Sequence, residues 1–412
     1  MSPTSEPSGP ALKRVFTGTH RTLPEEETLR RLEPLLPELG ITRVANITGL
    51  DDVGIPTVVV TRPEARSLSV SQGKGVSLVA AKVSGIMESI EQHVAERIQL
   101  PVWFGSQRER ERASELVNVQ ALPRFARPFD ADEPMLWLAA TGLESRTRRE
   151  VPFTLVTLDL RMPLPPGSGC FPMGSNGLAS GNCLEEAIAH GLWELMERDA
   201  LALFYQRSPR EQAGRRLRLD TIEHPTAQRL LAAFEAADVG VALWDMTTDL
   251  AVPAIFCSIV EGQLDVFRSV GVARGFGCHP DRDVALCRAL CEAAQSRLTR
   301  IAGSRDDLQR QQVDLLRTAA HIRHHQAQLV EPEQRDFRQL PSQQRPSFEA
   351  DLAWASAQLD VIVGEEPLYV DLSHPRLPVC VVRVITPGLE GSPDVPGYQP
   401  GARACALEAR HA

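Results

Sequence analysis

Three segments of the chain share one spacing of polar residues. In each segment a first polar residue is followed four positions later by a glutamate, and that glutamate is followed three positions later by a second glutamate or a glutamine. The three sets are Ser84, Glu88 and Glu91; His190, Glu194 and Glu197; and Arg288, Glu292 and Gln295. Positions i, i+4 and i+7 share one face of a helix, and the neighbouring residues are mostly apolar. Each segment therefore predicts a polar stripe on an otherwise buried helix.

Buried carboxylates that face one another repel and raise each other's pKa, so such a group is tolerated mainly when cations compensate it. Mg²⁺ is the natural cation because it prefers oxygen ligands and is usually held by a few carboxylates together with substrate phosphates. Arg198 follows Glu197, and Arg297 lies two residues beyond Gln295. These planar donors are placed to neutralise phosphate charge. The stripes therefore indicate a magnesium and nucleotide site.

A glycine-rich segment precedes each stripe, at residues 69–75, 174–182 and 271–279. The last glycine of each segment, Gly75, Gly181 or Gly277, stands 13, 13 or 15 residues before the first carboxylate. Glycine lets backbone N–H groups approach phosphate oxygens, and the start of a helix adds partial positive charge. We therefore predict three turns that cradle phosphate. The GxxxxGK[ST] frame is missing around Lys74, which disfavours a P-loop ATPase.

The elements that carry these residues read as a mixed α/β fold. Apolar residues at three and four spacing predict helices over residues 78–97, 184–204 and 284–301. Strand-like runs occupy residues 56–61, 151–160, 239–244, 255–260 and 379–385. Residues 1–14 read as a disordered tail, with folding expected to begin near residue 21, and the chain from residue 387 onwards reads as irregular.

Composition excludes several classes of function. The chain has 412 residues, a net charge of -9 and no apolar run long enough to span a membrane, which argues against nucleic-acid and membrane partners. The N-terminus has no signal-peptide pattern, so we expect a cytoplasmic protein whose eight cysteines are reduced. We expect Cys287 and Cys291 to pack as small apolar side chains on the buried face of their helix. His321, His324 and His325 read as solvent-facing rather than as metal ligands.

Beyond these patterns, residues 69–91, 175–199 and 288–297 resemble the YcaO family, and the likeness extends over about residues 15–400, with 401–412 as a C-terminal tail. In that family acidic helices surround ATP and magnesium in a site that has no P-loop. The resemblance implies metal or ATP ligands at Glu88, Glu91, Glu194, Glu197, Glu292 and Gln295. It implies nucleotide contacts from Lys74, Ser84, Asn176, Arg198 and Arg297. Glu194, Glu197 and Arg198 are the expected catalytic group, and His190, His20 and His279 read as supporting residues.

Two short segments, residues 18–22 and 303–307, resemble the YcaO subgroup that is encoded beside a TfuA partner. That subgroup is associated with the conversion of a backbone amide to a thioamide. The chain also lacks the Pro-x-Pro-x-Pro tail that many azoline-forming members carry. The resemblance therefore implies ATP-dependent thioamidation of a peptide with an external sulfide source and a TfuA-like sulfur-delivery partner. An azoline-forming cyclodehydratase and a non-catalytic ATP-binding scaffold are the alternatives, and a homodimer is a further expected assembly.

Overall fold

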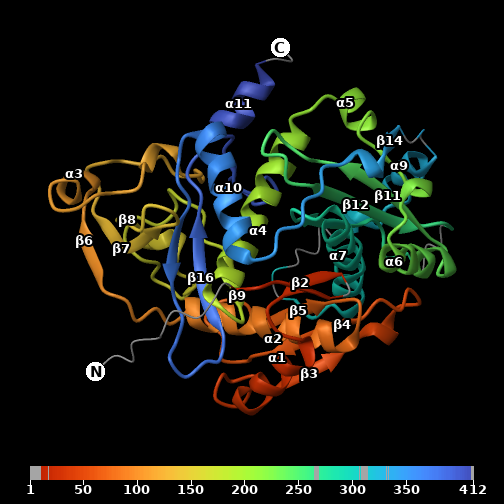
Figure 1. The fold of residues 1–412 in the computed structure, drawn as a ribbon, viewed down its shortest axis with the longest axis horizontal. Helices are drawn as coiled ribbons and strands as arrows, with labels where there is room; N and C mark the ends of the chain where they lie inside the picture. The colour runs from red at the N-terminus through yellow and green to blue at the C-terminus, as the bar shows by residue number, and fades with distance from the viewer. Residues whose placement is uncertain are drawn as a thin grey trace.

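The computed structural model describes residues 11–16, 18–263, 269–305, 307, 314–330, 332 and 334–409. Its centre consists of three units in which a strand is followed directly by a long helix (Figure 1). The units are β5 (Val70–Lys74) with α2 (Leu78–Ala95), β9 (Leu178–Gly181) with α4 (Leu184–Tyr205), and β13 (Ala273–Cys278) with α7 (Arg282–Ala302). These helices are the three that carry the predicted polar stripes, and their bounds agree with the prediction to within a few residues.

Each of the three helices begins beside the strand that precedes it and packs along that strand. The Ser77 hydroxyl caps α2 by accepting a hydrogen bond from the Ala80 amide at 3.0 Å, and the Asp281 carboxylate caps α7 at the Asp283 amide at 2.9 Å. Gly303 ends α7 with a φ of 57°, the left-handed conformation that glycine adopts without strain. Local capping therefore sets where α2 and α7 begin, whereas α4 begins at Cys183 without a side-chain cap.

The prediction that the glycine segments are turns is wrong for the parts that lie in strands, although residues 174–177 do form a turn before β9. Gly73, Gly181 and Gly275 lie within β5, β9 and β13, and each of these strands is covered by its own helix. A Cβ on Gly73 would collide with the Ala81 carbonyl oxygen of α2, and one on Gly275 would collide with the Ala289 carbonyl oxygen of α7. The glycines therefore permit close strand-to-helix packing, which brings each stripe to a fixed distance from its sheet.

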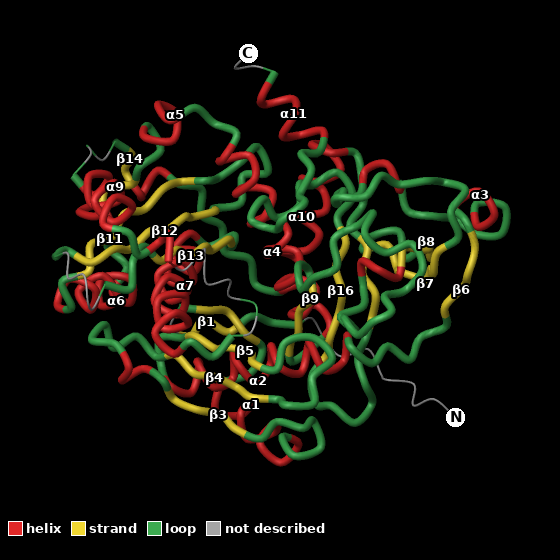
Figure 2. Tube along the Cα trace, turned by 180° about the vertical axis from the view of Figure 1, so that it is seen from behind, coloured by secondary structure: helices red, strands yellow, loops and turns green. Residues whose placement is uncertain are grey.

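Three antiparallel sheets supply these strands, and each sheet ends in the strand that precedes a striped helix. The first runs β3 (Arg43–Asn46), β4 (Thr57–Thr61), β5, and the second runs β11 (Val239–Asp245), β12 (Ala254–Glu261), β13. The third runs β6 (Val102–Gly105), β7 (Met135–Gly142), β15 (Leu368–Asp371), β16 (Cys380–Ile385), β9, with β8 (Arg148–Pro152) also on β7. Figure 2 shows the sheets from behind, arranged around the three helices.

The remaining elements cover the outside of this arrangement. They are β1 (Arg14–Phe16), β2 (Thr19–Arg21), α1 (Glu25–Leu32), α3 (Gln107–Arg110), α5 (Pro209–Ala213), β10 (Leu217–Arg218), α6 (Pro225–Ala236), α9 (Ala319–Leu329), β14 (Arg335–Asp336), α10 (Phe348–Val363) and α11 (Ala402–Glu408). Along the described ranges, no helix is both long and apolar enough to cross a membrane.

Several sequence predictions need correction. Four of the five expected strands are present, but the expected strand over residues 151–160 ends at Pro152, where a 3₁₀ turn begins. Residues 1–10 lie outside the described residues, whereas residues 11–14 are ordered, because Lys13 pairs with the buried Asp351 at 2.7 Å. The segment beyond residue 387 is not irregular throughout. It ends in α11, whose Arg403 pairs with the buried Asp199 of α4 at 3.0 Å.

Candidate functional site

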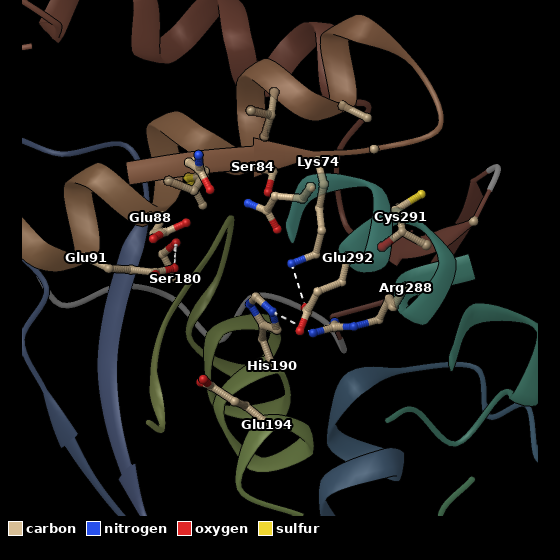
Figure 3. Close-up of a pocket in the computed structure, with 18 of the residues that line it drawn as sticks. Lys74, Ser84, Glu88, Glu91, Ser180, His190, Glu194, Arg288, Cys291 and Glu292 are labelled. Atoms are coloured by element: carbon tan, nitrogen blue, oxygen red, sulfur yellow. Dashed lines mark hydrogen bonds and ion pairs between the residues drawn. The ribbon is translucent and has the colours of Figure 1, made fainter. Parts of the chain in front are cut away.

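A cavity of about 550 Å³ lies between α2, α4 and α7, and all nine stripe residues line it. Figure 3 shows side chains from the three helices pointing toward this shared space. The helices come from distant parts of the chain, so the convergence cannot follow from local pattern alone. The lining carries carboxylates and cationic side chains together, among them Glu88, Glu194, Lys74 and Arg198. This composition suits a ligand that combines an anion with a metal cation.

Nine of the eleven residues that we predicted for the site line this cavity, and two do not. Arg297 instead pairs with Asp51 at 2.9 Å and with Glu261 at 2.8 Å, on the far side of α7. The backbone of Asn176 accepts a hydrogen bond from Arg383 at 2.7 Å, and it is Asn182 that lines the cavity. Arg297 and Asn176 therefore lie outside the lining of this cavity, and their nucleotide contacts stay a prediction.

One side of the cavity is organised by two contacts between facing elements. Lys74 Nζ lies 2.8 Å from Glu292 Oε2, which joins β5 to α7. Arg288 Nη2 lies 3.2 Å from His190 Nε2, which joins α7 to α4 through the first positions of two stripes. Burial raises the pKa of Glu292, but Lys74 and then Arg198 outweigh this, so the net pKa is lowered. Glu292 is therefore held as a carboxylate.

Two carboxyl groups elsewhere in the cavity have raised pKa values. Burial, with smaller contributions from Glu88 and Glu194, raises the pKa of Glu91 to about 8 in spite of the hydrogen bond that the Ser180 hydroxyl donates to Glu91 at 2.6 Å. Burial, together with the nearby Glu292, also raises the pKa of Glu197 to about 7, although Arg198 acts to lower it. A bound divalent cation would relieve this repulsion and stabilise the ionised carboxylates. The donor set therefore fits magnesium.

Arg198 lines the cavity and is only loosely held. Its Nη2 is 3.6 Å from Glu194 Oε1 and its Nη1 is 3.4 Å from Glu197 Oε1, both longer than a good charge-assisted hydrogen bond. Within the described part of the chain its Nε is buried and has no hydrogen-bond partner. A guanidinium in this state can turn its donors to an incoming phosphate at little cost.

No three side chains of His, Cys, Asp or Glu are already gathered for a metal ion among the residues that the structure describes. The stripe carboxylates are instead held apart, by Lys74 on Glu292, Ser180 on Glu91 and Arg198 on Glu194. His321, His324 and His325 lie apart from the stripes on α9, with the ring centres of His321 and His325 4.6 Å apart and those of His324 and His325 5.4 Å apart. Metal binding at the stripes therefore requires the carboxylates to exchange these partners.

Sequence reasoning missed a second group of lining residues, near the start of α4. Glu186 accepts hydrogen bonds from the Thr22 amide at 2.9 Å, from the Thr22 hydroxyl at 2.6 Å and from the Asn182 amide group at 3.1 Å. Arg21 lies beside it, with its Nε 3.8 Å from Glu186 Oε1. The spacing of Asn182 and Glu186, four residues apart across a helix start, was a visible signal. Their link to residues 21–22 was not.

Cysteine and histidine side chains near the cavity are buried and neutral. All eight cysteines are free, as expected for reduced thiols. Burial raises the pKa of Cys291 to about 12 and also raises that of Cys287, so neither presents a thiolate although both line the cavity. His20 and His279 pack edge to face at 5.1 Å, His279 also lies 6.4 Å from the Trp193 ring of α4, and burial lowers the pKa of both histidines.

The fold and the cavity define a class of protein in which acidic helices, rather than a P-loop, line a charged ligand site. A family model described as YcaO cyclodehydratase, ATP- and Mg²⁺-binding, matches residues 72–390. The chain belongs to the YcaO family. The predicted family and mixed fold are thus confirmed, and ATP and Mg²⁺ are its cofactors.

Relatives and solved structures agree with this assignment. The "uncharacterized protein in tfuA 3′ region" of Rhizobium leguminosarum bv. trifolii is 37% identical over 391 residues, covering 92% of this chain and 91% of that protein. An uncharacterized protein of Methanothermobacter thermautotrophicus is 34% identical over 375 residues, covering 88% and 93%.

Two solved structures are similar in fold. The YcaO protein of Methanopyrus kandleri bound with AMPPCP and Mg²⁺ gives a TM-score of 0.72 at 22% identity, covering 92% of this chain and 95% of that one. A heterocyclase in complex with substrate and cofactor gives 0.72 at 24% identity over 92% of this chain. The chain spans only 54% of the heterocyclase chain.

Proposed function

We propose that this protein uses ATP and magnesium to phosphorylate the oxygen of a peptide backbone amide and that the product is a thioamide. The observation that carries the first half is the convergence of nine stripe residues from three helices on one cavity. A scaffold that only bound nucleotide would not need carboxylates from all three helices facing the same space. The second half rests on the two segments that resemble the TfuA-associated subgroup.

In this proposal the stripe residues hold magnesium and the cationic residues hold phosphate. Glu88, Glu91, Glu194, Glu197, Glu292 and Gln295 supply oxygen ligands, the type of donor that magnesium prefers. Lys74, Arg198 and Ser84 bind and orient the triphosphate. Glu194, Glu197 and Arg198 are adjacent on one face of α4 and act at the transferred phosphoryl group, where fixed charges stabilise the transition state.

The proposed reaction balances without a protein nucleophile. Hydrosulfide adds to the amide carbon, and the C=O bond becomes a C–O⁻ single bond. That oxygen attacks the γ-phosphorus of ATP, and ADP leaves. The C–O bond then breaks as phosphate departs, the S–H proton goes to solvent or base, and C=S remains. Magnesium supplies charge neutralisation at the phosphates, while the chain's own residues position the reactants and exclude water.

Two observations support thioamide over azoline. Residues 18–22 and 303–307 are far apart in sequence, yet Gly18, Thr19, Arg21 and Arg305 all line the same cavity as the stripes. The segments that resemble the thioamide-forming subgroup are thus at the site of the proposed chemistry. The Rhizobium relative lies in a tfuA region, which supports a TfuA-like protein as the source of sulfur. The family description favours an azoline-forming cyclodehydratase as the second candidate.

Intact-mass spectrometry separates the two products. The purified chain and a TfuA-like protein encoded beside its gene are incubated with ATP, Mg²⁺, sodium sulfide and peptides from proteins encoded in the same neighbourhood. Exchange of oxygen for sulfur adds about 16 Da, whereas cyclodehydration removes one water. Loss of water with no dependence on sulfide would replace the thioamide proposal by the cyclodehydratase. Absence of any ATP turnover with all peptides would overturn both.

A further inference from the structure

A second, much smaller cavity lies beside the main one and shares part of its wall. Its volume is about 10 Å³, close to the least space that holds one water-sized molecule. Arg21, Glu186, His190 and Arg288 line both cavities. The contact of 3.2 Å between Arg288 and His190, drawn in Figure 3, therefore belongs to the shared wall. A ligand in the small cavity would be adjacent to the space proposed for ATP.

Three buried aromatic rings line the small cavity and pack against one another. The ring centres of His20 and His279 are 5.1 Å apart, and those of His279 and Trp193 are 6.4 Å apart. These residues are only 4%, 5% and 2% exposed in the order His20, His279, Trp193. In the described part of the chain, His20 Nδ1 and Trp193 Nε1 are buried without a hydrogen-bond partner. Because unpaired buried polar atoms are costly, we expect a ligand in the cavity to bond to them.

The proton positions on these rings decide which ligand the cavity accepts. Both histidines are neutral, because burial lowers the pKa of each. His279 Nδ1 accepts a hydrogen bond from the Asp281 amide at 3.0 Å, so its proton is on Nε2. His20 Nε2 lies 3.7 Å from Asp281 Oδ2, an acceptor, which favours a proton on that nitrogen and leaves Nδ1 as an acceptor. With the Trp193 N–H, the rings therefore offer two donors and one acceptor.

The charges around the small cavity favour an anion. Arg21 and Arg288 line it, and after burial they are among the largest causes that lower the pKa of His190. Arg288 donates its hydrogen bond of 3.2 Å to the neutral His190 ring, because arginine cannot accept. Glu186 is the only carboxylate among the lining residues that the structure describes, and it already accepts two hydrogen bonds from Thr22. Its charge is therefore compensated, whereas the arginines remain available to an anion.

We propose that the small cavity binds hydrosulfide, the nucleophile of the thioamide reaction, and this inference rests on the proposed function. Hydrosulfide has one non-hydrogen atom, lone pairs that accept hydrogen bonds and one S–H that donates. Its sulfur accepts from Trp193 Nε1 and His279 Nε2, and its S–H donates to His20 Nδ1. Sulfur also packs favourably against aromatic rings, and Phe348 adds a further ring to the lining.

Other small ligands match the three rings less well. Water brings two O–H donors, and the ring atoms accept only one of them. Chloride accepts hydrogen bonds but donates none, so His20 Nδ1 would stay without a partner. Residues 19–21 of the lining also belong to the segment that resembles the thioamide-forming subgroup. An azoline-forming enzyme takes its nucleophile from the peptide and has no need of a separate hydrosulfide site.

Initial rates of thioamide formation at varied sodium sulfide test the site on the full chain, without oxygen and with ATP, Mg²⁺ and peptide at saturation. Trp193→Phe keeps a ring but removes the donor, and it should raise the KM for sulfide by about tenfold while the KM for ATP stays unchanged. His20→Phe removes the acceptor and should have the same effect. Trp244→Phe is the matched control, because Trp244 is a buried tryptophan on β11 that lines neither cavity.

Calorimetric titration of sodium hydrosulfide into the chain, with no nucleotide or peptide, measures the site apart from the reaction. Wild type and Trp244→Phe should bind hydrosulfide, and the two cavity variants should bind it about tenfold more weakly. Thioamide formation with the same KM for sulfide in all four proteins would overturn the site and leave the proposed function standing. So would the absence of hydrosulfide binding to wild type. Hydrosulfide binding that the cavity variants weaken, with no thioamide formed, would support the site and count against the proposed function.

Discussion

Replacing Lys74 by methionine would test how charge is balanced in the nucleotide-free cavity. Lys74 Nζ is 2.8 Å from Glu292 Oε2, and Lys74 is the strongest of the cations that keep the pKa of Glu292 low against the effect of burial. Methionine keeps the length and apolar stem of the side chain but removes its charge. Glu292 would then retain Arg198 and Arg288 as nearby cations, and its ionised form would become less stable.

The magnitude follows from the exposure of the pair. The two side chains are 26% and 22% exposed, so the pair is neither at the surface nor fully buried. Removal of one partner from a fully buried pair costs about 3–5 kcal/mol, and an exposed pair contributes about 0.2–1 kcal/mol. We expect Lys74→Met to lower the free energy of unfolding by about 1–2 kcal/mol at pH 7, between these limits.

The effect has a defined dependence on pH. The pKa of Glu292 is lower in the folded chain than its ordinary value of 4.5, so the stabilisation is fully present above pH 4.5. It is lost as the pH falls through the folded pKa, where Glu292 becomes protonated. The difference between wild type and Lys74→Met should therefore be constant near neutral pH and shrink in acid below pH 4.5.

Urea denaturation of four proteins measures this coupling: wild type, Lys74→Met, Glu292→Gln and the double variant. A coupling energy of about 1 kcal/mol between the two sites is expected. Lys82→Met is the matched control, because Lys82 lies on α2 and does not line the cavity, and it should show no coupling to Glu292→Gln. Additive effects of Lys74→Met and Glu292→Gln would refute the reasoning.

Three further outcomes are expected. Glu197→Gln should lower ATP turnover by about 10²–10³-fold while circular dichroism stays unchanged, and full activity would remove Glu197 from the proposed catalytic group. His190→Phe should raise the KM for ATP by about tenfold, because Arg288 loses the hydrogen-bond acceptor that lies 3.2 Å away. His190→Gln, which keeps an acceptor, should restore part of the affinity for ATP. An equal rise of the KM in both variants would contradict a positioning role for His190. Glu96→Gln should lower the free energy of unfolding by about 3–5 kcal/mol at neutral pH, since Glu96 pairs with Arg62 in the core at 2.6 Å. Burial raises the pKa of Glu96, but hydrogen bonds outweigh it and bring the pKa to about 2, so acid titration from pH 4.5 to 2 should bring wild type and variant together.

The three stripes could be predicted from the sequence because helix periodicity is local. A carboxylate at i+4 and a second polar group at i+7 share a face whatever the rest of the chain does. The helices α2, α4 and α7 accordingly have nearly the predicted bounds, and their polar faces meet. The glycine segments were misread for the opposite reason. Glycine permits both a tight turn and a close approach of strand to helix, and only the packing of Gly73 and Gly275 distinguishes the two.

Residues outside the stripes could not be placed, because their role depends on contacts between distant segments. Arg297 follows the third stripe closely in sequence, but it is two residues beyond Gln295, which turns it about 200° around α7 toward Asp51. Thr22 reaches the site because Glu186, 164 residues away, accepts its hydrogen bonds, and Arg21 lies beside the same carboxylate, 3.8 Å from it. Spacing within a helix therefore predicts which face a side chain takes, whereas the partner of that face is decided by tertiary packing.

The repeat also explains why the cavity is asymmetric. The first stripe position holds Ser84 in α2, His190 in α4 and Arg288 in α7, so equivalent places on three similar units carry a hydroxyl, an acceptor ring and a cation. His190 and Arg288 bond to each other across the cavity, and Lys74 from the first unit completes that side by pairing with Glu292. Cations also reach the other carboxylates, since Arg305 lies near Glu88 and Arg198 lies 3.6 Å from Glu194, but the pKa of Glu91 stays raised. In the proposed function an ATP–magnesium complex would use both kinds of group, since its metal needs carboxylates and its remaining phosphate charge needs cations.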